Sequence, residues 1–329
     1  MGGINMREIT YREAVKEAMR EEMLRDDTVF QLGEDIGVFG GSYKVTLGLV
    51  EEFGKQRILD TPLAEAGIAG AAIGSALVGM RPVAEIMYMD FMTIASDLLI
   101  NTAAKTRFMS GGKIKLPLVV RTQEGGGVSA GPQHSQCLEM IFAHVPGLIV
   151  VLPSTPYDAK GLLKSAIRED NPVIFIEHKG LYASKGPVPE EEYLIPLAKA
   201  DIKREGKDIT VVALSRSVLF AMEAAKQLAQ EGVDIEIVDP MTIKPLDKEC
   251  IIQSVKKTGR LLIVHEASRS YGFGAEVAAI VAEEAIDYLN APIKRIGALD
   301  VPIPFGLRLE NFVLPNAGDI VKAAHMLME

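Results

Sequence analysis

The sequence predicts an α/β fold with parallel sheets, because short apolar runs alternate with longer segments of helical spacing. The apolar runs have the length of strands and are bounded by turn residues, as expected of parallel strands that are buried on both faces. In the first half of the chain the strand-like runs are 29–32, 83–87, 118–120, 148–152 and 173–176. The helix-like segments between them are 66–77, 95–107 and 158–168.

The first helix is expected to begin after Thr10 and to end near Arg25. Thr10 and Glu13 have the spacing of a capping box, in which each side chain bonds the other residue's backbone N–H. Apolar residues then follow at helical spacing. The last of the helix-like segments named above has a similar start, with Thr155 as its cap and Pro156 at its first position.

Charged residues and prolines concentrate between 185 and 207, which indicates a connector between two compact units. We place the domain boundary near residue 190. After it the alternation resumes, with strands expected at 209–214, 233–238 and 261–264 and helices at 218–231, 247–257 and 319–328. The sequence therefore predicts two α/β domains, 1–190 and a smaller one over 191–329.

The composition disfavours several classes of function. A net charge of -9 without a basic run argues against a nucleic-acid or anionic membrane surface. The cysteines, Cys137 and Cys250, form no CxxC pair, so neither a disulfide framework nor a zinc site is supported. No apolar stretch reaches the roughly 20 residues that a membrane-spanning helix needs. We therefore expect a cytoplasmic protein that binds small molecules and other proteins.

Residues 127–131 read Gly-Val-Ser-Ala-Gly, which matches the pattern of a hydrolase nucleophile elbow. An elbow needs a strand that leads directly into Ser129 and a helix that leaves it. Here residues 124–127 intervene and Pro132 follows. A glycine-rich loop shaped by backbone requirements fits better, and a serine hydrolase acting through Ser129 stays an alternative. Neither a Rossmann fingerprint nor a phosphate-binding P-loop is present.

Polar residues follow the ends of several expected strands, where open α/β sheets bind their ligands. Glu34 follows the first strand, Glu65 precedes the helix over 66–77, and His134 lies in the glycine-rich loop. Each has an ordinary explanation as well. A carboxylate at a helix start interacts with the helix dipole, an acidic pair can form a simple turn, and loop histidines are commonly structural. Spacing alone assigns these residues no mechanism.

Several stretches together resemble the beta subunits of the pyruvate, branched-chain and acetoin dehydrogenase complexes. They read GEDIG (33–37), ILDTPLAEAGIAGAAIGSALVGMRPVAEIMYMDF (58–91), NTAAKTRFMSGG (101–112), GPQHSQ (131–136), PSTPYDAKGLLKSAIREDNPVIFIEHKGLY (153–182) and DVPIPFG (300–306). Such proteins pair a pyrimidine-binding thiamine diphosphate domain with a transketolase C-terminal domain, which agrees with the two predicted α/β units. The resemblance implies the beta subunit of a thiamine-diphosphate-dependent 2-oxo acid dehydrogenase.

The resemblance also assigns roles to individual residues. Glu65 matches the glutamate that bonds a pyrimidine ring nitrogen and favours the imino tautomer, in which the cofactor removes its own thiazolium proton. The apolar segment after Glu65 suits a carboxyl group whose pKa burial must raise. Glu34 matches a second acidic residue near the cofactor, and Met87 and Phe91 match cofactor-binding residues, of which Phe91 packs against the pyrimidine ring. His134 matches a histidine on the substrate side.

The same resemblance implies sites for metal ions. It implies a structural potassium site, built largely from carbonyl oxygens, around Ala166, Glu169 and Asn171. Thiamine enzymes hold the diphosphate and Mg²⁺ through a GDG motif, because the metal needs oxygen ligands beside the phosphates. This chain has no GDG. An alpha subunit is therefore expected to hold the diphosphate and Mg²⁺, in a heterotetramer of two alpha and two beta subunits with the site at the subunit interface.

With that partner, the chain is expected to decarboxylate a 2-oxo acid, or to cleave acetoin, and to pass the acyl group to lipoyl groups. Its C-terminal domain is expected to dock the subunit-binding domain of the lipoyl transacylase core. Pyruvate is the leading substrate, and acetoin and branched 2-oxo acids stay alternatives because the unseen alpha chain shapes the pocket. A non-catalytic scaffold subunit is a further alternative, and the joint presence of Glu34, Glu65, Phe91 and His134 argues against it. A self-sufficient transketolase-like enzyme is disfavoured by the length and the missing GDG motif.

Overall fold

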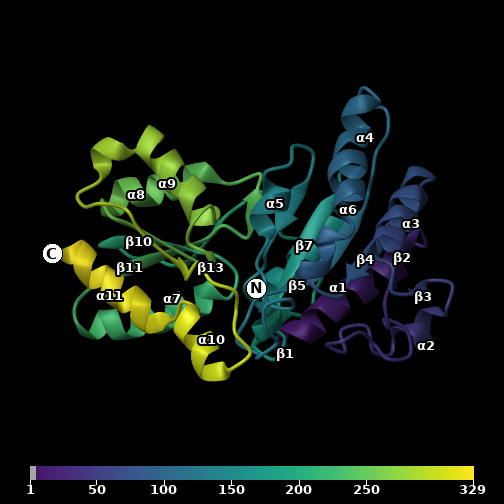
Figure 1. The fold of residues 1–329 in the computed structure, drawn as a ribbon, viewed down its shortest axis with the longest axis horizontal. Coiled ribbons are helices and arrows are strands. Elements are labelled where there is room, and N and C mark those ends of the chain that lie inside the picture. Colours follow the sequence, from purple (N-terminus) through teal and green to yellow (C-terminus); the bar gives the residue numbers. More distant parts are fainter. Residues whose placement is uncertain (1–4) are drawn as a thin grey trace. The chain divides into compact units, whose positions relative to one another are not determined.

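A computed structural model describes residues 5–329, which form two compact α/β units (Figure 1). Unit 1 contains the described residues up to 124 together with 141–197, and unit 2 contains 125–140 and 198–329. The predicted alternation of strand and helix is confirmed in both. Within the described residues, no helix is long and apolar enough to cross a membrane.

The main sheet of unit 1 is parallel, and its strands are adjacent in the order β6-β7-β5-β4-β2-β3. The strands are β2 (Val29–Gly33), β3 (Ile58–Asp60), β4 (Arg81–Ile86), β5 (Val119–Glu124), β6 (Ile149–Val151) and β7 (Val173–His178). Every residue of β2, β5 and β7 is buried, as expected of parallel strands covered on both faces. The helices along this part of the chain are α1 (Tyr11–Arg25), α2 (Leu49–Phe53), α3 (Glu65–Leu77), α4 (Ala104–Met109), α5 (Glu139–Ala143) and α6 (Pro156–Arg168).

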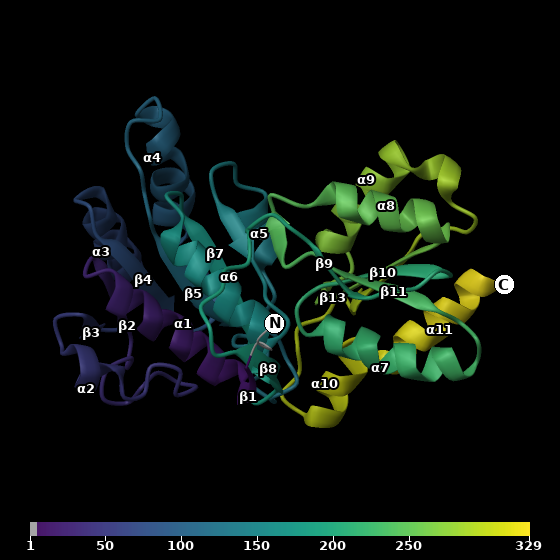
Figure 2. The same cartoon turned by 180° about the vertical axis from the view of Figure 1, so that it is seen from behind.

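Unit 2 is built on a sheet of order β14-β13-β10-β11-β9, in which only β9 is antiparallel to its neighbour. The strands of this sheet are β9 (Asp201–Arg204), β10 (Ile209–Ala213), β11 (Ile235–Asp239), β13 (Leu261–Ser268) and β14 (Lys294–Ala298). The short strand β12 (Thr242–Lys244) is not part of it. Its helices are α7 (Ser217–Gln230), α8 (Lys248–Thr258), α9 (Phe273–Glu284), α10 (Leu307–Val313) and α11 (Ala317–Met328). Helices α8 and α9 cover one face of the sheet, and α7 and α11 cover the other (Figures 1 and 2).

The helix expected over 95–107 is confirmed, with one local variation. Residues 96–109 are helical throughout, but their middle part, Leu98–Ala103, is a π-helical turn that leads directly into the short α4. Within α4, Thr106 Oγ1 donates to the Thr102 carbonyl at 2.7 Å. Another expectation about local structure is wrong. The expected connector over 185–207 contains strand β8 (Lys185–Pro189), paired antiparallel with β1 (Met6–Thr10), and strand β9.

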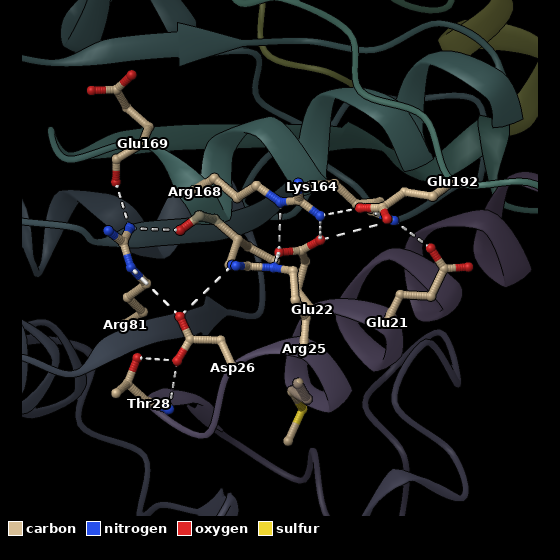
Figure 3. Close-up of polar contacts among 12 residues, drawn as sticks. Glu21, Glu22, Arg25, Asp26, Thr28, Arg81, Lys164, Arg168, Glu169 and Glu192 are labelled. Carbon is tan, nitrogen blue, oxygen red and sulfur yellow. Dashed lines mark hydrogen bonds and ion pairs between the residues drawn. The ribbon is translucent and has the colours of Figure 1, made fainter.

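Helices α1 and α6 lie side by side and are joined by charged side chains (Figure 3). The Lys164 ammonium pairs with Glu21 at 2.5 Å, and Arg168 pairs with Glu22 at 2.7 Å. Lys164 is 1% exposed and Glu22 is fully buried. Buried charges are tolerated only when they are paired, so these contacts fix α6 against α1. We interpret this cluster as structural, because its charges neutralise one another.

A second buried cluster links neighbouring strands of unit 1. Arg121 of β5 is fully buried and pairs with Glu85 of β4 at 2.7 Å and with Glu177 of β7 at 2.6 Å. The Tyr182 hydroxyl donates to the same Glu177 at 2.7 Å. Burial raises the pKa of Glu85, and the attraction of Arg121 offsets part of that increase. The cluster fixes the end of β4, from which part of the candidate site follows.

Candidate active site

The carboxyl edge of the unit 1 sheet contains a topological switch point. From β2 the chain continues to β3 on one side, whereas from β4 it continues to β5 on the other. Open α/β sheets bind ligands in the crevice at such a point. Glu34 directly follows β2, Glu65 begins α3 after β3, and Met87 and Phe91 follow β4. The structure thus brings these four predicted residues to the same edge of the sheet.

Glu34 and Glu65 lie within electrostatic reach of each other. Glu34 is 4% exposed, and its Oε1 atom has no hydrogen-bond partner among the described residues. Burial, with the charge of Glu65 as the next cause, raises the pKa of Glu34, while the Ala64 N–H bonds its carboxylate and lowers it in part. Glu65 itself is half-buried in the first turn of α3. Glu34 is therefore the more buried of the two carboxyl groups.

The backbone on either side of Glu34 is closely held. Asp35 has a φ of 56°, in the left-handed region that few residues other than glycine adopt. A Cβ atom at Gly33 would lie 2.8 Å from the Glu85 carbonyl oxygen, so a larger residue does not fit there. The Gly37 N–H donates to the Asp60 carboxylate at 2.6 Å. These contacts fix the direction in which Glu34 leaves β2.

Phe91 lies in a 3₁₀ turn, Met89–Thr93, and its ring is half-buried. It meets Tyr88 edge to face, with the ring centres 5.6 Å apart and the planes at 84°. Tyr88 in turn meets Tyr43 edge to face at 6.4 Å. These contacts hold Phe91 in place and leave part of its ring accessible to a flat ligand. Met87, immediately after β4, is also half-buried.

His134 belongs to unit 2, whereas the four residues above belong to unit 1. It is half-buried, and its backbone N–H donates to the Gly131 carbonyl at 3.4 Å. The loop before it does not form a nucleophile elbow. Strand β5 ends at Glu124, five residues before Ser129, and the next helix begins only at Glu139. The geometry that a serine hydrolase requires is therefore not formed around Ser129.

The residues expected to bind potassium lie on the turn after α6. Arg81 Nη1 donates to the Glu169 carbonyl and to the Ile167 carbonyl, both at 3.0 Å (Figure 3). The Ala166 carbonyl accepts from the Glu169 N–H at 3.2 Å. Arg107 donates to the Asn171 Oδ1 atom at 2.7 Å. Guanidinium groups thus bond the Glu169 carbonyl and Asn171 Oδ1, whereas a backbone N–H bonds the Ala166 carbonyl. A potassium ion at this turn stays a prediction.

Sequence reasoning missed other residues that support the site. Glu85 and Arg121 fix the end of β4. Glu266 and Glu310 accept hydrogen bonds from the backbone of the loop that precedes His134. Nothing in their local spacing predicts these contacts, because each joins segments far apart in the sequence.

Two family models match the chain. One, the transketolase pyrimidine binding domain, matches residues 7–185, and the other, the transketolase C-terminal domain, matches 198–320. The chain is also 48% identical to the pyruvate dehydrogenase E1 component subunit beta of Rickettsia felis, over 96% of this chain and 97% of that protein. It belongs to the family of dehydrogenase E1 beta subunits with transketolase-type domains.

A second relative in this E1 beta family is the 2-oxoisovalerate dehydrogenase subunit beta of Bacillus subtilis, 47% identical over 98% of this chain and 99% of that protein. Among solved structures, a split gene transketolase in an inactive beta4 tetramer matches with a TM-score of 0.79 and 25% identity. It covers 99% of this chain and 98% of its own. Identities of 48% and 47% to relatives with different names do not separate their substrates.

The residues at the sheet edge fit the aminopyrimidine part of thiamine diphosphate, the cofactor that the family implies. The Glu34 Oε1 atom is buried and lacks a donor among the described residues, so a ligand that brings an N–H group would satisfy it. Phe91 offers a partly accessible ring to a flat heterocycle. Glu65, half-buried beside Glu34, offers a second carboxyl group for a ring nitrogen.

Proposed function

We propose that this chain is the beta subunit of a thiamine-diphosphate-dependent 2-oxo acid dehydrogenase, with pyruvate as its substrate. The observation that carries the proposal is the pair Glu34 and Glu65 at the switch point, with an unpartnered buried oxygen on Glu34, in a chain of the E1 beta family. When bound, thiamine diphosphate would supply a nucleophilic carbon for the 2-oxo group and a cationic ring that can take up the electron pair released with CO₂.

The chain's own residues prepare that chemistry. Glu65 holds the proton at the pyrimidine ring nitrogen and so favours the tautomer that can deprotonate the thiazolium carbon. Glu34, whose pKa burial raises, keeps a proton to higher pH and limits the repulsion between the two carboxyl groups. Phe91 and Met87 orient the pyrimidine ring. His134 serves the substrate side, where an imidazole can donate or accept a hydrogen bond.

We further propose that the chain works only with an alpha subunit, in a heterotetramer of two alpha and two beta subunits. The sequence lacks the GDG motif, so the alpha subunit holds the diphosphate and Mg²⁺. A relative of the same fold is described as an inactive tetramer of its beta chain alone, which supports this dependence. The acyl group then passes to lipoyl groups of a transacylase core.

The domain roles follow from the same proposal. Residues 1–190 form the domain that binds the pyrimidine, and 191–329 form the transketolase C-terminal domain that docks the core's subunit-binding domain. Neither Cys137 nor Cys250 forms a disulfide in the described part of the chain, which suits a reducing compartment. We therefore place the assembly in the cytoplasm.

The substrate is tested on the chain co-expressed with its alpha partner. Turnover is measured with thiamine diphosphate, Mg²⁺ and an artificial electron acceptor, on pyruvate, branched 2-oxo acids and acetoin. We expect kcat/KM for pyruvate to exceed that for branched 2-oxo acids by about 10-fold or more, because a pocket shaped for a methyl group excludes larger side chains. A higher kcat/KM for acetoin or a branched acid would replace the substrate but keep the family. An assembled pair that is inactive on all of them would contradict the proposed function.

A further inference from the structure

The loop that leads to His134 has an unusual backbone. Positive φ angles recur at every second residue from 125 to 131, with values of 91°, 83°, 56° and 79°. Left-handed residues that alternate with others turn successive N–H groups toward one side and form a concavity that binds anions. Three of these four residues are glycines, and the fourth is Ser129. The loop is therefore built to hold a negative charge against its backbone.

Carboxylates of unit 2 occupy this concavity. The two oxygens of Glu310, on α10, accept the Gly127 N–H at 2.8 Å and the Ser129 N–H at 3.0 Å. Glu266, near the end of β13, accepts the Gly126 N–H at 2.6 Å. Hydrogen bonds from backbone N–H groups to carboxylates are among the stronger kinds in proteins. Both carboxylates therefore hold the loop directly.

Glu310 depends on the loop in turn. It is fully buried, and among the described residues no lysine, arginine or histidine pairs with it. The two loop N–H groups are its hydrogen-bond donors in the described chain. A buried carboxylate without partners is costly, so a loop that moved away would leave Glu310 in an unfavourable state. The loop and α10 therefore keep each other in position.

The other side of the loop leaves little room for movement. Arg216 Nη1 donates to the Gly126 carbonyl at 3.3 Å. A Cβ atom at Gly127 would lie only 2.3 Å from the same nitrogen, and one at Gly131 would lie 2.4 Å from the Phe305 ring. The glycines are thus required by close packing as well as by their φ angles.

We propose that Glu310 is a positioning residue of the active site, which acts by holding the 126–129 backbone and thereby fixes His134 for the reacting substrate. The proposal rests on the proposed function, in which His134 serves the substrate side. Glu310 acts only through the loop. Its effect on catalysis must therefore disappear when the histidine side chain is absent.

The test is a double-mutant cycle in the co-assembled enzyme, with Glu310→Gln, His134→Ala and both together. A glutamine places an NH₂ group against one of the two loop N–H groups, so it keeps one hydrogen bond and loses the other. We expect Glu310→Gln to lower kcat about 10- to 100-fold, because small displacements of a reacting group have effects of this size. The KM for the 2-oxo acid and the affinity for thiamine diphosphate should stay within about twofold. Hydrogen exchange of the backbone amides of residues 127 and 129 should become faster than in the wild-type enzyme.

The decisive quantity is the coupling between the two positions. In the His134→Ala background, Glu310→Gln should lower kcat less than about twofold. Full additivity of the two losses would overturn the inference and leave the proposed function intact. If His134→Ala itself left turnover unchanged, the proposed role of His134 would fail first, and the inference with it. Glu223→Gln, an exposed glutamate on α7, is the matched control and should change nothing.

A second variant carries the same test if Glu310→Gln does not fold. Gly127→Ala displaces the loop from the opposite side, because its new methyl group meets Arg216 and its φ of 83° disfavours alanine. It should produce the same loss of kcat and the same coupling to His134. Wild-type kcat in Gly127→Ala, with faster amide exchange in the loop, would show that loop position does not matter for the reaction.

Discussion

Glutamine in place of Glu65 is expected to lower the turnover of the assembled enzyme by roughly 100-fold or more, because the amide cannot hold or exchange a proton at the pyrimidine ring nitrogen. The fold should be unaffected, since Glu65 is only half-buried and glutamine has the same shape. Steady-state kinetics on the co-expressed pair, beside a thermal melt of each variant, measures both effects.

The control for this substitution is Glu51→Gln. Glu51 also lies in the first turn of a helix, α2, and is exposed. It removes one carboxylate from a similar local setting without touching the sheet edge. Glu51→Gln should keep wild-type turnover. If Glu65→Gln, folded and assembled, also turned over at the wild-type rate, the proton-holding role of Glu65 would be wrong.

The largest expected effect on stability comes from Arg121→Met. The substitution leaves the carboxylates of Glu85 and Glu177 in the core without their cation, and removal of one member of a buried ion cluster typically lowers the free energy of unfolding by about 3–5 kcal/mol. Urea unfolding followed by circular dichroism measures the change.

A compensated variant distinguishes charge from shape in this cluster. Combining Arg121→Met with Glu85→Gln and Glu177→Gln removes the uncompensated charges and should recover more than half of the lost unfolding free energy. A single Arg121→Met variant that lost less than about 1 kcal/mol would mean that the buried carboxylates find other partners or protonate without cost.

Local signals in the sequence predicted the helix starts well. The capping box of α1 and the Thr155 cap of α6 form as expected, with the Glu13 N–H bonded to Thr10 at 3.2 Å and the Asp158 N–H bonded to Thr155 at 3.1 Å. Such caps depend on residues three apart, so they can be recognised in the sequence without knowledge of tertiary contacts. Strand β8 was missed because its partner β1 lies far earlier in the sequence, so no local signal shows the pairing. The prolines that suggested a connector are tolerated in a two-stranded ribbon.

The candidate site was predictable to a similar extent. Glu34, Glu65, Met87 and Phe91 follow strand ends, and the resemblance to a family added their roles. The hydrogen bonds between Glu310 and the loop before His134 were not predictable, because Glu310 lies 183 residues from Gly127 in the sequence. Nor did the sequence indicate that Glu34 is more buried than Glu65, since that difference depends on how β2, β3 and α3 pack.

The buried Arg121 cluster illustrates the same limit. A charged residue inside an apolar run interrupts the pattern that predicts a buried strand, and local spacing does not reveal a counter-ion on a neighbouring strand. Glu177 lies 56 residues further along the chain, and Glu85 lies 36 residues before Arg121. The parallel order of β4, β5 and β7 places all three side by side.

The central claim is that this chain supplies half of a thiamine diphosphate site, and turnover of the chain with and without its alpha partner tests that claim most directly. Both preparations receive thiamine diphosphate, Mg²⁺, the 2-oxo acid and an artificial electron acceptor. We predict turnover for the pair and none above background for the chain alone. Comparable turnover by the purified chain alone would contradict it, because the diphosphate and its metal would then be held here.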